Sequence, residues 1–264
     1  MADTRQMLDQ ADLHKKETVI NKFINLIRPT YNDYVNISYW SLIKITGEGI
    51  LKGMKHSAPI YAKGKLVDIG CGFKPYKSIF DPYVNSYFGI DYKETADANY
   101  GSNTKADLYV DCTETGMPSE SFDTLLSTQV MEHIYDTKKY IFECHRLLKK
   151  GGKGIFTIPQ TWQCHGEPYD FYRFTKFSIE NLFKEYGFKI IELKPLNGAY
   201  STVIQTKIVS VYFRETSGIF FRLVKAFRFF FIIPVLNYKA LLFDKLFWND
   251  KLCLNYLLVV EKVK

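Results

Sequence analysis

The stretch KLVDIGCGFKPY, residues 65–76, decides the fold of this chain. A short apolar run leads into Asp68, and Gly70 and Gly72 follow at once, which is typical of a buried strand that ends in a tight turn. In an open parallel sheet, ligands bind where strands end and helices begin. We therefore expect residues 65–69 to form a strand and the turn after them to bind a ligand.

Further strand-like segments alternate with helical ones along the chain, and the clearest of the helical segments is 136–149. This alternation predicts an α/β fold: a doubly wound, mostly parallel sheet with helices on both faces. The expected strands cover residues 65–69, 86–90, 107–110, 122–127, 153–158, 188–193 and 252–262.

Helical patterns flank this sheet region on both sides. We expect an N-terminal helical cap over residues 1–60, with helices over 5–27 and 34–54. The ligand-binding core is expected to cover residues 61–198. Residues 199–264 are basic and aromatic, and they are expected to form a helical insertion before a final strand that rejoins the sheet.

Charge is distributed unevenly along the 264 residues. The net charge is +7, and residues 201–264 alone hold ten Lys and Arg against four Asp and Glu. Any attraction to an anionic partner is therefore expected in the last quarter of the chain.

The five cysteines lack CxxC spacing, which favours reduced thiols in a cytoplasmic protein over a disulfide framework. The pairs Cys144-His145 and Cys164-His165 lack further ligands at zinc-finger spacing, so we expect no metal site. The charged N-terminus is not typical of a signal peptide, and no run of about twenty apolar residues predicts a membrane span. We expect a cytoplasmic location, with the inner membrane face as a peripheral site.

A second acid identifies the class of ligand. Asp91 lies about twenty residues beyond the glycine turn, at the end of the next expected strand, where an acid suits ribose hydroxyls. Pro75 replaces the third glycine of a dinucleotide site, and the charge of Asp68 would oppose a pyrophosphate. A ribose-bearing cation without phosphate is favoured, and S-adenosylmethionine has this chemistry.

At these residues the sequence resembles the class I S-adenosylmethionine-dependent methyltransferases. The resemblance covers roughly residues 64–195. It implies a seven-stranded Rossmann-like sheet, S-adenosylmethionine as cofactor, and methyl transfer that leaves S-adenosylhomocysteine. The matching segments are VDIGCG, GID, VDCTETGMPSESFDTLLSTQVMEHI and LLKKGGKGIFTIP.

The resemblance also implies roles for single residues. Asp68 would reach the ammonium group of the cofactor and Asp91 its ribose. Asp111 would accept a hydrogen bond from the adenine amino group, with Asp107 as the alternative, and the backbone of Cys112 would face the ring. The expected cofactor-binding residues are Asp68, Gly70, Cys71, Gly72, Asp91, Asp111, Cys112 and Gln129.

Gln129 and His133 follow the fourth expected strand, next to the expected methyl group. His133 is the candidate general base for an acceptor hydroxyl, because a neutral imidazole can take a proton near pH 7. The alternative is a histidine that only hydrogen-bonds the backbone and shapes the loop. Glu132 is expected to turn toward the backbone or the cofactor ribose.

The segment HGEPYDFYRFTKFSIENLFKEYGF, residues 165–188, resembles a bacterial subgroup associated with cell-surface polysaccharide and glycolipid biosynthesis. A small-molecule, sugar or lipid-linked glycan acceptor is implied. The alternative is a surface loop in which Asp170 and Arg173 pair with each other. The expected substrate-binding residues are His165, Tyr169, Asp170, Tyr172 and Arg173.

Two other functions stay open from the sequence. One is an RNA or other nucleic-acid methyltransferase, which the basic charge favours. Against it, the sequence STQVMEH after the fourth strand lacks an Asn/Asp-Pro-Pro-aromatic tetrad. The other is a non-catalytic module that only binds the cofactor.

Residues 218–234 read as a helix that ends at Pro234, with Arg222, Lys225 and Arg228 recurring every three residues among apolar ones. Such a helix either lies on an anionic membrane surface or packs as a cap over the core.

Overall fold

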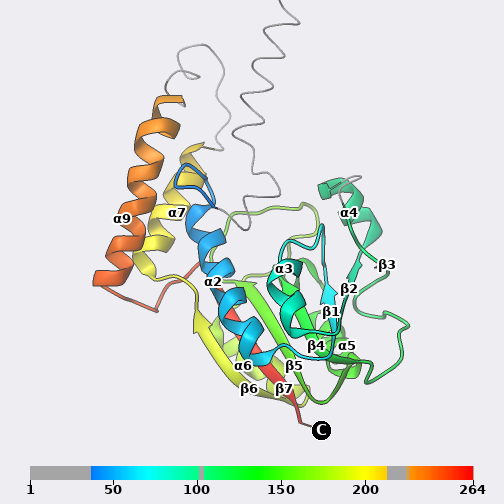
Figure 1. Cartoon of the computed structure of the whole chain (residues 1–264). Helices are drawn as coiled ribbons and strands as arrows, with labels where there is room; N and C mark the ends of the chain where they lie inside the picture. The colour runs from blue at the N-terminus through cyan, green and yellow to red at the C-terminus, as the bar shows by residue number, and fades with distance from the viewer. Residues whose placement is uncertain (1–36, 101–103, 213–223, 225, 264) are drawn as a thin grey trace, which may run out of the picture.

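A computed structural model of the chain describes residues 37–100, 104–212, 224 and 226–263. Its sheet has seven strands in the order β3-β2-β1-β4-β5-β7-β6, and only β7 runs antiparallel to its neighbours. The predicted α/β, mostly parallel fold is confirmed (Figure 1). The strands are β1 (Lys65–Ile69), β2 (Ser86–Asp91), β3 (Leu108–Tyr109), β4 (Phe122–Thr128), β5 (Leu148–Pro159), β6 (Phe188–Pro195) and β7 (Asn255–Lys262).

Side chains of each central strand alternate between two core clusters, as the period of a strand requires. In β1, Leu66 packs in one cluster and Val67 in the other. The first cluster includes apolar residues of α2 (Lys44–Tyr61) and α3 (Lys77–Phe80). The second includes those of α5 (Thr137–Leu147) and α6 (Lys176–Glu185). Helices therefore cover both faces of the sheet, which makes it doubly wound.

The helix expected over 34–54 is α2, Lys44–Tyr61, and it begins and ends later than predicted. Turns occupy the residues before it, since Ser41 N–H donates to Ser38 O and Lys44 N–H to Ser41 O. Its far end continues because Met54 and Ala58 are fully buried against the sheet. The helix expected over 5–27 lies outside the described residues, and the domain boundaries at residues 60 and 198 stay predictions.

The expectation that Pro234 ends a helix is wrong. The π-helix η5 (Arg228–Ile232) leads into α9 (Ile233–Leu246), and Pro234 lies in the first turn of α9. Proline is tolerated there because its missing N–H needs no partner. Figure 1 shows α9 beside α7 (Ala199–Tyr212), beyond the end of the sheet.

Three short helices complete the described chain: α4 (Lys93–Tyr100), η2 (Asp81–Tyr83) and η4 (Met131–His133). The last of these follows β4 directly, at the edge of the sheet where β1 and β2 also end. Within the described ranges, no helix is both long and apolar enough to cross a membrane.

Candidate active site

The turn after β1 is fixed by hydrogen bonds to the neighbouring strand β2. Gly70 and Cys71 both donate their N–H to Ile90 O, at 2.9 and 3.0 Å. Gly70 has φ of +68°, and a Cβ added there would lie 2.4 Å from Val130 Cγ2. A side chain at Gly70 would therefore clash with the residue that precedes η4. Because Gly70 has no side chain, the end of β1 and the segment after β4 can lie close together.

Asp91 at the end of β2 joins this turn. Its Oδ2 accepts from Gly72 N–H at 2.7 Å, and its Oδ1 accepts from Tyr92 N–H at 2.8 Å. The two predicted acids thus lie at the ends of adjacent parallel strands, as expected from their spacing. The carboxylate of Asp91 is held in one orientation before any ligand arrives.

Asp68 is buried beneath the same turn and has one acceptor unused. Tyr87 donates its hydroxyl to Oδ2 at 2.5 Å, whereas Oδ1 has no hydrogen-bond partner. Burial raises the pKa of Asp68 to about 7. A buried, unpaired carboxylate oxygen suits a cationic group, so the residues present fit the ammonium of S-adenosylmethionine.

The pKa of Asp68 predicts how cofactor affinity depends on pH. Below about pH 7 the free protein holds Asp68 protonated, and pairing with an ammonium requires that this proton leave. Affinity for S-adenosylhomocysteine should therefore fall as the pH drops below about 7, by up to about tenfold per pH unit. Calorimetric titrations with S-adenosylhomocysteine from about pH 6 to about pH 8 measure this pH dependence of the affinity. Asp68→Asn should remove the slope, and an unchanged slope in that variant would contradict the assignment.

The two candidate acids near β3 have different surroundings. Asp107 Oδ2 accepts from Lys74 Nζ and from Gly89 N–H, so it ties its loop to β2. Asp111 is exposed, and within the described part of the chain its carboxylate accepts from Thr113 alone, through the N–H and the hydroxyl, each at 2.8 Å. Asp107 is thus already used within the protein, which leaves Asp111 as our proposed adenine residue.

Cys112 follows Asp111 and is half-buried, and burial raises the pKa of its thiol to about 12. The thiol therefore stays protonated, which agrees with a role for the backbone and not for the sulfur. The loop that carries both residues is held by Glu143 of α5, which accepts from Thr115 N–H at 2.9 Å. Neither Glu143 nor Lys74 stands out in the sequence, because both are ordinary residues of an exposed helix or turn.

Gln129 lies at the end of β4 with φ of +57°. Its N–H donates to Thr157 O at 3.0 Å and its side-chain amide donates to Thr157 Oγ1 at 3.1 Å. These bonds fix the start of the segment that leads into η4. Gln129 is therefore a fixed residue at the same edge of the sheet as Asp68 and Asp91.

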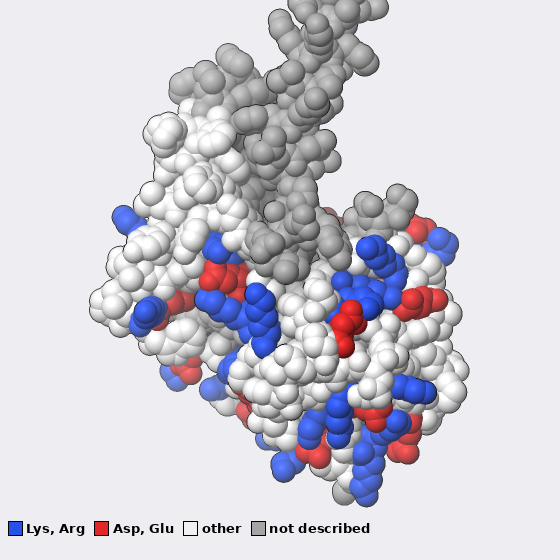
Figure 2. All heavy atoms as spheres, in the orientation of Figure 1, with Lys and Arg blue, Asp and Glu red and all other residues white. Residues whose placement is uncertain are grey.

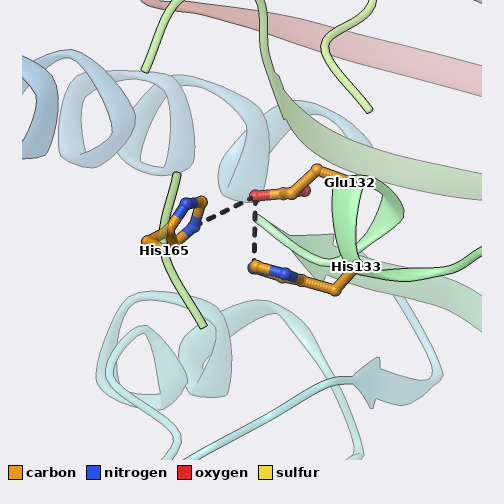
Figure 3. A group of neighbouring side chains, drawn as sticks. All are labelled: Glu132, His133 and His165. Atoms are coloured by element: carbon orange, nitrogen blue, oxygen red, sulfur yellow. Dashed lines mark ion pairs between the residues drawn. The ribbon is translucent and has the colours of Figure 1, made fainter. Parts of the chain in front are cut away.

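Three further side chains come together at η4 (Figure 3). Glu132 Oε1 lies 3.8 Å from His133 Nε2 and 4.0 Å from His165 Nε2. Glu132 is fully buried, and burial raises its pKa to about 8. The Glu132 side chain faces two imidazoles, and the expectation that it turns toward the backbone or a ribose stays a prediction. His133 hydrogen-bonds the backbone through Nδ1, at Tyr169 O, and keeps Nε2 free.

The loop at 160–174 packs onto η4. It contains the Asp170–Arg173 ion pair that the sequence offered as the alternative to a substrate-binding role. Arg173 binds Asp170 with two hydrogen bonds, of 2.7 and 2.8 Å. Burial opposes ionisation of Asp170, but the bonds from Arg173 hold its pKa at about 2. Phe171 and Tyr172 donate their N–H groups to Glu132 O. The pair therefore shapes a loop that covers the end of β4, and the Arg173 guanidinium is used within it.

The chain was compared with known proteins. Residues 67–156 match the family described as a methyltransferase domain. A probable S-adenosylmethionine-dependent methyltransferase of Mycolicibacterium smegmatis is 23% identical over 135 residues, which cover 45% of this chain and 52% of that protein. One from Mycobacterium tuberculosis is 26% identical over 104 residues, 39% of this chain and 38% of that protein. The chain thus spans about half or less of the curated relatives it matches.

Solved structures share the fold at low identity. A S-adenosylmethionine-dependent methyltransferase from Archaeoglobus fulgidus has a TM-score of 0.52 at 12% identity, over 83% of this chain and 97% of that one. Phosphoethanolamine N-methyltransferase 2 of Haemonchus contortus, in complex with S-adenosyl-L-methionine, has a TM-score of 0.50 at 15% identity, over 89% and 60%. Residues 67–156 thus match a methyltransferase domain, the curated relatives are named as S-adenosylmethionine-dependent methyltransferases, and the solved structures share the fold.

Proposed function

We propose that this chain transfers a methyl group from S-adenosylmethionine to a small-molecule, sugar or lipid-linked glycan acceptor and releases S-adenosylhomocysteine. The observation that carries this proposal is the buried Oδ1 of Asp68, which lacks a hydrogen-bond partner among the described residues, beside a turn whose three N–H groups at residues 70–72 are all bonded. A descendant of this fold that no longer bound the cofactor would have no need to keep an unpaired buried acid, which costs stability. Turnover with labelled cofactor separates an enzyme from a module that only binds it.

The cofactor is held, in this proposal, by residues from four strand ends. Asp68 pairs with the ammonium group and Asp91 binds the ribose hydroxyls. Asp111 and the backbone of Cys112 bind the adenine, and Gln129 lies beside the methionine portion. The bound cofactor supplies an activated methyl group, so the protein's main task is to align the acceptor.

On the acceptor side we assign His133 to the removal of the acceptor's proton. Its Nδ1 is fixed on Tyr169 O, so Nε2 is the nitrogen left for chemistry. Burial lowers the pKa of His133, which keeps the imidazole neutral near pH 7. The loop at 160–174 lies over the same strand end, and Tyr169 is 40% exposed there, as an aromatic platform for a sugar ring would need to be.

A glycan-type acceptor is favoured over a nucleic acid by the described surface. Figure 2 shows Lys and Arg interspersed with Asp and Glu across the face in view, and not gathered into one basic stripe. A nucleic-acid substrate would need such a stripe, because backbone phosphates dominate its affinity. The test is to incubate the chain with methyl-labelled S-adenosylmethionine and bacterial extract, fractionated into lipid, glycan, small-molecule and RNA pools. Label in the RNA pool, or in no pool, would overturn the proposal.

We further propose that the basic segment 218–234 takes the chain to anionic membrane surfaces. Support comes from its described part, where Phe227 is 58% and Phe231 64% exposed beside the exposed Arg228. Arg222 and Lys225 lie outside the described residues. Because each basic residue near such a surface contributes about 1 kcal/mol, replacing all three by Gln should largely abolish binding. Co-sedimentation with anionic and neutral vesicles measures this binding. A wild-type protein that stays in solution with anionic vesicles at low salt would contradict the membrane proposal.

A further inference from the structure

The Glu132, His133 and His165 side chains form a cluster that methyl transfer as outlined does not explain. Their ligand atoms all lie within 4.8 Å of one another. Glu132 is fully buried, and neither of its carboxylate oxygens has a hydrogen-bond partner in the part of the chain that the structure describes. An acid in that state is costly unless a proton or a cation lies beside it.

The hydrogen bonds behind the two imidazoles set which nitrogen carries the proton. Nδ1 of His133 faces the carbonyl oxygen of Tyr169, and Nδ1 of His165 lies 3.3 Å from Gln163 O. A carbonyl only accepts, so both Nδ1 atoms must donate. In the neutral rings, each Nε2 then presents a lone pair, and each Nε2 is the atom nearest to Glu132.

Charged neighbours of His165 support the same tautomer. Asp170 Oδ2 lies 3.4 Å from its Nδ1, and the negative charge of this carboxylate favours a proton on that nitrogen. Arg173 Nη2 also lies 3.4 Å from Nδ1, but it donates to Asp170 Oδ2 at 2.8 Å and to Gln163 O at 2.9 Å. Three electron-pair donors therefore face one another.

We propose that this cluster binds a divalent transition-metal ion, with Zn²⁺ as the best fit. Two imidazole nitrogens and one carboxylate, with a position left open, are the ligand set of catalytic zinc sites. A carbonyl or carboxylate behind each ligating imidazole is the usual second layer of such a site, and here Tyr169 O and Asp170 supply it.

The three ligand atoms must move closer together to bind zinc. Zinc bonds of about 2.0–2.1 Å in a tetrahedron place ligand atoms about 3.4 Å apart. The observed 3.8 and 4.0 Å from Glu132 would shorten by about half an ångström, and the pair of imidazole nitrogens, which lies within 4.8 Å, by up to about 1.4 Å. Side-chain torsions of the two histidines can supply this movement. The expectation of no metal rested on zinc-finger spacing of Cys and His, and that pattern does not cover a three-ligand site assembled from η4 and a loop.

The ion would also explain how His133 serves the acceptor, a consequence that rests on the proposed function. An acceptor oxygen at the open position would lose its proton to solvent more readily, because a bound cation lowers the pKa of its ligands. His133 would then act as a ligand and not take the proton itself. Metal binding does not depend on this consequence.

The test uses the full chain without a polyhistidine tag, freed of metal by a chelator and titrated with Co²⁺. We expect visible absorption bands of low-coordinate cobalt at one ion per chain, reversed by Zn²⁺ and not by Mg²⁺. Glu132→Gln and His165→Ala should each weaken binding by about a hundredfold or more. Glu132→Gln keeps the shape of the buried side chain and His165 lies on a loop, so both variants should fold.

His56→Ala is the matched control, since His56 also pairs with an acid, Glu192, at 3.3 Å, but there the acid is already paired with Lys194 and accepts from the Tyr61 hydroxyl. Its cobalt affinity should equal that of the wild type. A wild type that gives no such bands, or bands that persist in both ligand variants, would overturn the metal site. That result would not test the methyl-transfer proposal, because the titration contains neither cofactor nor acceptor.

Discussion

Replacing His133 with alanine should lower the rate of methyl transfer by about a hundredfold or more, while affinity for S-adenosylhomocysteine changes little. The imidazole serves the acceptor, either as a base or as a metal ligand. Of the residues assigned to the cofactor, Gln129 shares its strand end, and the others lie at the ends of β1, β2 and β3. Single-turnover transfer from labelled S-adenosylmethionine measures the rate, and calorimetry measures the affinity.

His56→Ala serves again as the control, because it removes an exposed imidazole from α2. A loss of less than about tenfold in the His133→Ala rate would show that His133 only shapes the loop through Tyr169 O. A parallel loss of cofactor affinity would show instead that the variant disturbs the turn after β4.

Replacing Glu143 with alanine should lower the free energy of unfolding by about 3 kcal/mol. Glu143 is 4% exposed and accepts from Arg146 through two bonds of 2.7 Å, and from Thr115 through its N–H and hydroxyl. The hydrogen bonds hold the pKa of Glu143 below its usual value in spite of burial. Its loss leaves buried donors unpaired in the loop that carries Asp111. Urea unfolding measures the change.

Glu185→Ala is the matched control on the neighbouring helix α6. Glu185 is 56% exposed and pairs with Lys138 at 3.4 Å, so its loss should cost no more than about 1 kcal/mol. Equal destabilisation by the two variants would show that the Glu143 network does not hold the loop.

The strand-end acids could be predicted from the sequence because each depends on local pattern. Asp68 and Asp91 each end an apolar run, and parallel strands bring such ends to one edge of the sheet. The contacts of Asp107 could not be predicted, because its partner Lys74 lies 33 positions earlier in the sequence. Lys74 also has a φ of +59°, which nothing in the sequence signals.

The Glu132 cluster was missed for a similar reason. His165 meets Glu132 only because the loop at 160–174 folds back, and that fold depends on backbone bonds from Phe171 and Tyr172. The sequence did favour an Asp170–Arg173 pair as an alternative, and the pair is present. What the sequence could not show is that this pair helps to place His165 at the end of β4.

Calorimetric titration with S-adenosylhomocysteine, of the wild type beside Asp91→Ala, tests the central claim most directly. We predict one site per chain in the wild type, and a loss of about 1.5–3 kcal/mol in Asp91→Ala, because a charge-assisted hydrogen bond to ribose is removed. Asp97→Ala, which removes an exposed acid paired with Lys93 on α4, should bind as the wild type does. No binding by the wild type, or equal affinity in Asp91→Ala, would contradict the assignment of this strand edge as the cofactor site.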